Sequence, residues 1–230
     1  MQASLPVRRS SLGEEAKAAG VPWYWVPGKE RFTKATLPSD APGSGTVFPV
    51  KNKFVPKGPN DGMCCFGYKR PGGRTHSGVD LFARHLNPIY AVASGRVVSF
   101  YYYFDGTFAL FVDHGDYVVN YGECDPSSLA ECQLVAEYTN TYERRTLIST
   151  NKKGTKVSAG DKIALVGRLN SGSSMLHFEM YQAGTKWNKN WNGFPSTAAP
   201  GAFYNPTNFL LALAGKKTIT PEEYVPAVCR

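Results

Sequence analysis

The sequence predicts a mainly β fold, and three of its features carry that prediction. The 230 residues include 23 glycines and 16 prolines, which favour a chain with many turns. Hydrophobic residues make up 42% of the chain and aromatic residues 13%, a composition typical of a globular protein with its own core. Short apolar runs broken by Gly, Pro and Asp begin near Thr46 and indicate successive strands of an antiparallel sheet.

Three regions are expected along the chain. Residues 1–46 combine weak helical character, an aromatic WYW segment and a turn-rich stretch, so we expect an N-terminal extension and linker. Residues 47–215 are expected to form the main domain, and residues 216–230 a C-terminal tail.

Five segments have the length and composition of strands, and one has those of a helix. The strand segments are PIYAVASGRVVSFYYYF, TFALFVDHG, YVVNYGE, KIALVGRL and MLHFEMY. The helix is expected in PTNFLLALAGKK, because Pro and Thr lie near its start, an apolar face follows, and a glycine precedes a basic pair. We expect this helix to pack against the sheet.

The chain carries 26 Lys and Arg against 18 Asp and Glu, a net charge of +8 that would attract a polyanion. These basic residues are scattered in short pairs without a zinc finger or an RNP-like motif, which favours a basic surface over a nucleic-acid-binding protein. No apolar stretch is long enough to span a bilayer. The amino terminus has no apolar signal segment, so we expect synthesis in the cytoplasm without standard secretion.

Three residues form a candidate metal site. His76 lies four residues before Asp80, and an even spacing on extended backbone turns both side chains to one side. Imidazole nitrogen and carboxylate oxygen are good zinc ligands, although a hydrogen-bonded surface pair has the same pattern. His177 lies in the segment SGSSMLHFEMY and would supply a third ligand. Three protein ligands leave a fourth position for water, as in catalytic zinc sites.

Five blocks in order make this pattern more specific: HSGVD, IYAVASGRVV, FVDHG, VSAGDKIALVG and LHFEMY. Over residues 70–182 they resemble the lysostaphin and LytM type of zinc metallopeptidase, which cuts peptide cross-links or stems of peptidoglycan. The resemblance implies a lysostaphin-like fold, a central antiparallel sheet with a groove floored by the metal site. It also implies one Zn²⁺ held by His76, Asp80 and His177.

Two positions depart from the pattern of that family. Met175 stands where the family has the first histidine of a His-x-His pair, and a thioether cannot take a proton at neutral pH. Glu123 stands where the family has the histidine of a Tyr-x-His pair, and we expect it to serve as the general base. Strand alternation puts Tyr121 on the same face as Glu123. Tyr121 could therefore bind the substrate or the oxyanion, with a buried structural tyrosine as the alternative.

Supporting residues are expected around these positions. Glu179 alternates onto the face of His177 and could orient it through a hydrogen bond, with a surface salt bridge as the alternative. His114 matches a turn of the family and is expected to support the strands near the site. Met175, Trp187 and Trp191 are expected to line a substrate groove, with aromatic packing of an irregular loop as the alternative for the two tryptophans.

The sequence therefore predicts a zinc-dependent endopeptidase that hydrolyses amide bonds in peptidoglycan stem peptides or cross-links. The alternative is a catalytically inactive homologue that binds the cell wall or serves as a structural component. Without a signal peptide, action in the periplasm or cell wall would follow cell lysis or injection. A phage lysin or virion protein and an effector of a secretion system both fit this expectation, and peptidoglycan is the expected partner.

Overall fold

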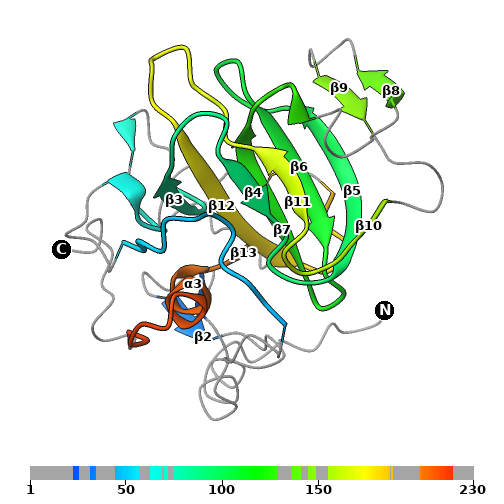
Figure 1. Ribbon diagram of the computed structural model, residues 1–230. Coiled ribbons are helices and arrows are strands. Elements are labelled where there is room, and N and C mark those ends of the chain that lie inside the picture. The colour runs from blue at the N-terminus through cyan, green and yellow to red at the C-terminus, as the bar shows by residue number, and fades with distance from the viewer. Residues whose placement is uncertain are drawn as a thin grey trace, which may run out of the picture.

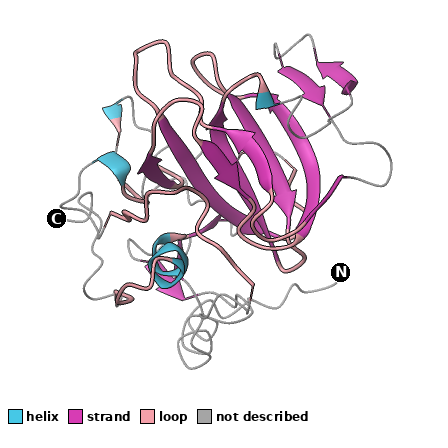
Figure 2. Ribbon diagram, viewed as in Figure 1, coloured by secondary structure: helices cyan, strands magenta, loops and turns pink. Residues whose placement is uncertain are grey.

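A computed structural model of the chain describes residues 23–25, 32–34, 45–56, 63–68, 70–71, 75–128, 136–140, 145–148, 155–186, 188 and 203–219. Strands dominate this part of the chain, and the one α-helix whose bounds lie within the described ranges is short (Figure 2). The mainly β fold predicted from the sequence is therefore confirmed. The helix also lies where the sequence predicts it.

The elements, in chain order, are β1 (Trp23–Trp25), β2 (Phe32–Lys34), β3 (Val79–Phe82), β4 (Pro88–Tyr90), β5 (Gly95–Tyr102), β6 (Phe108–Asp113), β7 (Tyr117–Cys124), β8 (Ala136–Asn140), β9 (Arg145–Ile148), β10 (Thr155–Val157), β11 (Lys162–Leu165), β12 (Met175–Gln182), β13 (Phe203–Tyr204) and α3 (Thr207–Leu213).

The main sheet brings strands from distant parts of the chain side by side. Its order is β2-β1-β13-β12-β7-β6-β5-β9-β8, with β3 also paired to β12 and β10 to β5. The paired strands are antiparallel, as the sequence predicts. Strands β4 and β11 form a separate antiparallel pair, drawn in front of the main sheet in Figure 1.

The two faces of the main sheet have different surroundings. Tyr121 on β7 is paired with Phe178 on β12, and both are fully buried on one face. Helix α3 packs on this face through Phe209, whose ring stacks on Phe178 with centroids 6.4 Å apart. The segment after β4 covers the same face, where the amide of Val92 donates to the Tyr121 hydroxyl at 2.9 Å. Because side chains alternate along a strand, His177 lies on the opposite face.

Two regions outside the predicted central strands also join this sheet. Strand β1, from the predicted N-terminal extension, pairs with β13 through Tyr24 and Tyr204. The hairpin of β8 and β9, from the stretch between Cys124 and β10, joins β5 where Phe100 pairs with Ile148. The three domain boundaries drawn from the sequence stay a prediction.

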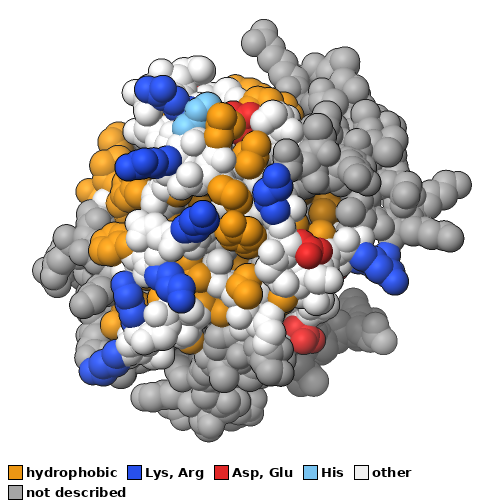
Figure 3. Space-filling view, viewed as in Figure 1, with side chains coloured by type: hydrophobic (Ala, Val, Ile, Leu, Met, Phe, Trp, Pro, Cys, Tyr) orange, Lys and Arg blue, Asp and Glu red, His pale blue; other side chains and the backbone are white. Residues whose placement is uncertain are grey.

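The surface seen from the front is rich in basic side chains. Figure 3 shows Lys and Arg spread across this face among hydrophobic and uncharged groups, with few carboxylates between them. Within the described ranges, no helix has the length and apolar character needed to cross a membrane.

Candidate metal centre

His76, Asp80 and His177 form a compact buried cluster. One ligand atom from each residue lies within 4.8 Å of the others, and each residue is less than 7% exposed. Asp80 and His177 are brought together by strand pairing, since they are direct partners between β3 and β12. His76 precedes β3 by three positions and reaches the same point. The structure therefore assembles the three residues that the sequence singles out as metal ligands.

Gly78, between His76 and Asp80, lets this segment approach β12 closely. A Cβ atom at this position would lie 2.5 Å from the Phe178 carbonyl oxygen and 3.0 Å from Cε1 of His177. Real Cβ atoms do not come so close to a backbone oxygen, so a larger residue would push β3 away from β12. The close packing of β3 on β12 at the site thus explains why the HSGVD block has a glycine at this position.

Hydrogen bonds orient the two imidazole rings so that their remaining nitrogens converge. Nδ1 of His76 donates to the carbonyl oxygen of Cys65 at 2.8 Å, because that oxygen can only accept. Nε2 of His177 lies 3.0 Å from Oε1 of Glu179. Nε2 of His76 and Nδ1 of His177 then face each other at 3.0 Å. They lie 3.1 and 2.8 Å from Oδ1 of Asp80, respectively.

The three residues of the cluster influence one another's pKa values. Burial opposes a charge on His177, but Glu179 and Asp80 raise its pKa to about 10. Burial lowers the pKa of His76, so His76 is the neutral member of the pair. Burial alone would raise the pKa of Asp80, but His76 and His177 lower it well below its ordinary value. Without a proton on His177, the ring nitrogens of His76 and His177 and the carboxylate of Asp80 would present only lone pairs to one point. The proton on His177 therefore holds these three groups together.

A divalent cation would replace that proton with a better match. Two imidazole nitrogens and one carboxylate oxygen are the donor set that zinc accepts, and three protein ligands leave a coordination position open. The residues therefore fit a zinc ion, which would be held by Nε2 of His76, Oδ1 of Asp80 and Nδ1 of His177.

Glu179 anchors His177 from the side away from the cluster. Its carboxylate is 1% exposed, and it accepts hydrogen bonds from Ser77 and Asn120 and, at 2.7 Å, from the hydroxyl of Tyr181. Burial alone would raise the pKa of Glu179, but His177, Asn120 and Ser77 lower it to about 2. The contact between Glu179 and His177 expected from the sequence is present, and it lies inside the protein rather than on its surface.

A bulge in β7 separates Glu123 from the regular alternation of that strand. Tyr121 pairs with Leu110 and Cys124 with Phe108, so β7 contains one residue more than β6 over this stretch. Glu123 has a φ of 62°, a left-handed conformation that is uncommon for a residue with a side chain. Bulges of this kind are frequent beside active sites, where they redirect a side chain.

The redirected Glu123 carboxyl is buried beside the cluster. Burial raises its pKa to about 7, the charge of His177 lowers it and that of Asp80 raises it. The residue is 8% exposed, and Oε2 has no hydrogen-bond partner in the described part of the chain. An unpaired buried carboxyl oxygen is costly, and a pKa near neutrality suits a group that accepts and returns a proton.

Tyr121 and His114, also singled out from the sequence, lie on the other face of the sheet. The Tyr121 hydroxyl accepts from the amide of Val92 and lies 3.2 Å from Nε2 of His114. Nδ1 of His114 lies 3.1 Å from the carbonyl oxygen of Ser94. Tyr121 is fully buried and is not brought together with the metal cluster. Regular alternation predicted that Tyr121 and Glu123 lie on the same face of the sheet. That prediction was wrong, because the bulge interrupts the alternation between them.

Two residues at the site were not singled out from the sequence. Nη2 of Arg70 binds Oδ2 of Asp80 at 2.7 Å and also donates to the carbonyl oxygen of Met63. The ring of Tyr103 stacks on His177 with centroids 5.9 Å apart and planes inclined by 29°. Burial raises the pKa of the Tyr103 hydroxyl well above its ordinary value. The sequence offered only a run of three tyrosines at the end of a predicted strand.

The predicted groove residues are only partly described. Met175 is 9% exposed and is the β12 partner of Phe82, one alternation step beyond the pair of His177 and Asp80. Trp187 and Trp191 lie outside the described residues. The described residue Lys186 accepts a hydrogen bond on its carbonyl oxygen from Ser99 of β5 at 2.6 Å.

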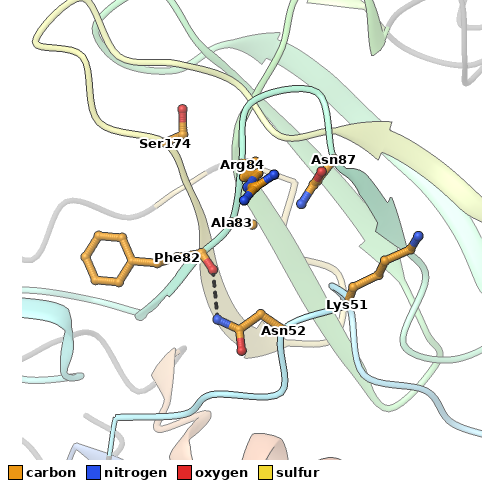
Figure 4. A pocket seen from close by; sticks show the side chains of 7 residues that line it. All are labelled: Lys51, Asn52, Phe82, Ala83, Arg84, Asn87 and Ser174. Atoms are coloured by element: carbon orange, nitrogen blue, oxygen red, sulfur yellow. Dashed lines mark hydrogen bonds between the residues drawn. The ribbon is translucent and has the colours of Figure 1, made fainter.

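A separate hollow of about 500 Å³ opens near the end of β3. Its lining residues are Lys51, Asn52, Phe82, Ala83, Arg84, Asn87 and Ser174. Figure 4 shows that the Phe82 ring points away from the other lining side chains, and that Asn52 binds the Phe82 carbonyl oxygen. The lining includes two cations and no carboxylate, and none of its residues belongs to the metal cluster.

Comparisons with known proteins found distantly similar solved structures, and no match among family models or curated proteins. The chain is similar to the catalytic domain of the antimicrobial peptidase lysostaphin from Staphylococcus simulans, with 21% identity, a TM-score of 0.38, and coverage of 65% of this chain and 90% of that one. It is also similar to a zinc-containing peptidase from Vibrio cholerae, with 22% identity, a TM-score of 0.39, and coverage of 69% and 42%.

A third solved structure is cbpa from L. salivarius REN, with 17% identity, a TM-score of 0.43, and coverage of 77% of this chain and 100% of that one. This chain spans less than half of the Vibrio cholerae protein. All of these likenesses are distant, so the function proposed below rests on the sequence blocks and on the site.

Proposed function

We propose that this protein is a zinc-dependent endopeptidase that hydrolyses amide bonds in peptidoglycan stem peptides or cross-links. The observation that carries the proposal is the convergence of His76, Asp80 and His177 on one point, with the unpaired carboxyl of Glu123 beside it. The order of the sequence blocks supports peptidoglycan as the substrate. The net charge of +8 would favour contact with an anionic cell wall.

The residues of the site divide the work of the reaction. When bound, a zinc ion supplies Lewis acidity: it polarises a carbonyl group and makes water a stronger acid. Glu123 accepts a proton from the attacking water on its carboxylate and passes it to the nitrogen of the leaving amine. Glu179 keeps His177 in the tautomer whose Nδ1 lone pair faces the cluster.

Two features of Glu123 support its role as the base. A carboxyl with a pKa near 7 changes protonation state easily at neutral pH, which is the condition for efficient proton transfer in both directions. The left-handed φ of 62° costs about 1–3 kcal/mol for a residue other than glycine. A strained backbone at a buried carboxyl that senses the charges of His177 and Asp80 is typical of a functional position.

The test is the release of soluble muropeptides from purified peptidoglycan by the zinc-loaded protein. Glu123→Gln should lower the rate of release by about 10²–10⁴-fold without loss of zinc, and His177→Ala should abolish release with loss of zinc. Asp116→Asn is the matched control, because this exposed carboxylate lies in a turn. A wild-type protein that binds zinc but releases nothing from several wall types would establish the alternative, a wall-binding or structural component.

The place of action follows from the proposed substrate, and it is the periplasm or the cell wall of a bacterium. Whether the protein reaches it as a phage lysin, as a virion protein or through a secretion system stays a prediction.

A further inference from the structure

Tyr103 lies at the metal cluster because of the register of β5. Side chains alternate along this strand, and Tyr101 and Tyr103 point to the same face. Tyr101 stacks on Phe111, which is paired with Asn120, so this is also the face of Glu179. Tyr103 follows β5 directly, and its ring reaches across this face to His177.

The ring of Tyr103 is held in place on both sides. It stacks on His177 with a centroid separation of 5.9 Å. On β7, a Cβ atom at Gly122 would lie 3.2 Å from Cε1 of Tyr103, so the ring packs directly on the backbone of that glycine. The amide of Tyr103 donates to the carbonyl oxygen of Thr107 at 2.9 Å, which fixes the backbone. The hydroxyl is thereby positioned without being bound itself.

The Tyr103 hydroxyl differs from its neighbours in having no partner. Within the described ranges, it forms no hydrogen bond, and it is not among the buried polar atoms closed off from solvent. Four other tyrosine hydroxyls on or near this sheet are engaged: those of Tyr101, Tyr102, Tyr121 and Tyr181. A tyrosine in a packed position usually finds a partner for its hydroxyl. The exception lies close enough to the cluster that the charges of Glu179, Glu123 and Asp80 act on the Tyr103 hydroxyl, so a substrate bound at the cluster could supply the partner.

The other side chains of the site leave a need for such a donor. Hydrolysis of an amide places negative charge on the carbonyl oxygen, and donors aimed at that oxygen stabilise the transition state. Ionised Glu123 can only accept, and the Met175 thioether has no proton to give. Arg70 can donate, but its Nη2 is already bound to Asp80 and to the Met63 carbonyl oxygen, and its Nε, which has no partner in the described part of the chain, is closed off from solvent.

We propose that the Tyr103 hydroxyl donates a hydrogen bond to the carbonyl oxygen of the scissile amide as negative charge develops on it. Tyr103 thus supplies stabilisation that Met175 cannot give. The proton stays on the phenol throughout, so the step forms and breaks no covalent bond at Tyr103. This inference rests on the proposed endopeptidase function.

Tyr103→Phe tests the proposal, because it keeps the stacked ring and removes only the hydroxyl. Tyr102→Phe at the preceding position is the matched control, since Tyr102 is 39% exposed and its hydroxyl accepts from Gly106 at 3.2 Å. Removal of an oxyanion donor lowers kcat by about 10²–10³-fold in comparable sites. We expect a loss of that size for Tyr103→Phe, with little change in KM, zinc affinity and melting temperature. We expect no loss for Tyr102→Phe.

A second measurement keeps this inference separate from the proposed function. Inorganic phosphate, a small tetrahedral oxyanion, is titrated by calorimetry into the zinc-loaded wild type and both variants. We expect Tyr103→Phe to bind phosphate more weakly than the wild type does, and Tyr102→Phe to bind it as the wild type does. If the wild type hydrolyses no wall but this difference is found, the endopeptidase proposal fails while the donor role of Tyr103 stands. Full kcat in Tyr103→Phe, or phosphate binding equal to that of the wild type, overturns the inference.

Discussion

Oε1 of Glu179 lies 3.0 Å from Nε2 of His177, on the side of the imidazole that faces away from the metal cluster. This contact decides which nitrogen of His177 carries a proton when the residue is neutral. Because Nε2 donates to the carboxylate, Nδ1 keeps its lone pair and faces Asp80 and His76. Glu179 would therefore act on a bound metal ion through His177 without touching it, as carboxylates behind metal-bound histidines commonly do.

Glu179→Gln should lower the affinity for zinc by about 10–100-fold, the usual cost of removing such a supporting group. The amide has nearly the shape of the carboxylate, but its nitrogen would face the donors of Asn120 and Tyr181. Competition with a chromophoric chelator measures the affinity. Asp125→Asn is the control, because it alters another histidine–carboxylate pair, formed with the exposed His85. Equal zinc affinity in wild type and Glu179→Gln would contradict the role.

The activity should depend on the ionisation of Glu123. The base must be ionised to accept a proton, so kcat/KM should rise with pH and reach a plateau. Burial raises the pKa of Glu123 from 4.5 to about 7, and a bound cation would lower it again. We expect the midpoint of the rise between these two values. In Glu123→Gln, the residual rate should be lower by about 10²–10⁴-fold and should lose this titration. A wild-type profile that is flat from pH 4 to 8 would contradict the assignment.

Glu123 should also cost stability at neutral and alkaline pH in the metal-free protein. Between its ordinary pKa of 4.5 and the folded value of about 7, the unfolded chain releases a proton that the folded chain keeps. Stability therefore falls as the pH rises through this window, by at most about 3 kcal/mol. Glu123→Gln should raise the melting temperature at pH 8 and have little effect at pH 4. Thermal unfolding in the presence of a chelator measures both, and an equal change at the two pH values would argue against a buried, titrating Glu123.

Gly78→Ala should separate β3 from β12. The added methyl group would meet the Phe178 carbonyl oxygen at 2.5 Å and His177 at 3.0 Å, and neither strand can move without breaking the pairing of Asp80 with His177. Overpacking of this kind costs about 1–3 kcal/mol. We expect a lower urea midpoint and a loss of zinc affinity greater than that of Glu179→Gln. Unchanged stability and zinc affinity would show that the close approach is not required.

The cluster of candidate metal ligands could be predicted because its signal lies within short stretches of sequence. Spacing on extended backbone joins His76 to Asp80, and strand alternation relates His177 to Glu179. The order of the blocks then connected the two stretches. The structure assembles these four residues, with Asp80 paired to His177 and Glu179 bound to its ring.

The mainly β fold and the helix on the sheet were likewise determined by local patterns of apolar residues, turns and caps. Those patterns do not specify which strands become neighbours. β5, β6 and β7 pair with their neighbours along the chain, and the pairing of the distant strand β12 with β7 then brings His177 to Tyr103. No local feature marks Tyr103 among three consecutive tyrosines.

The tertiary structure also decided the positions of Glu123 and Tyr121. Regular alternation would keep them on one face, since they are two residues apart. The extra residue in β7 and the left-handed φ of Glu123 break that period, and Tyr121 is buried on the face of Phe178. A bulge depends on the register of two strands, so it cannot be read from one strand alone. The sequence determined which residues could bind a metal. Strand register decided which other residues lie beside that cluster.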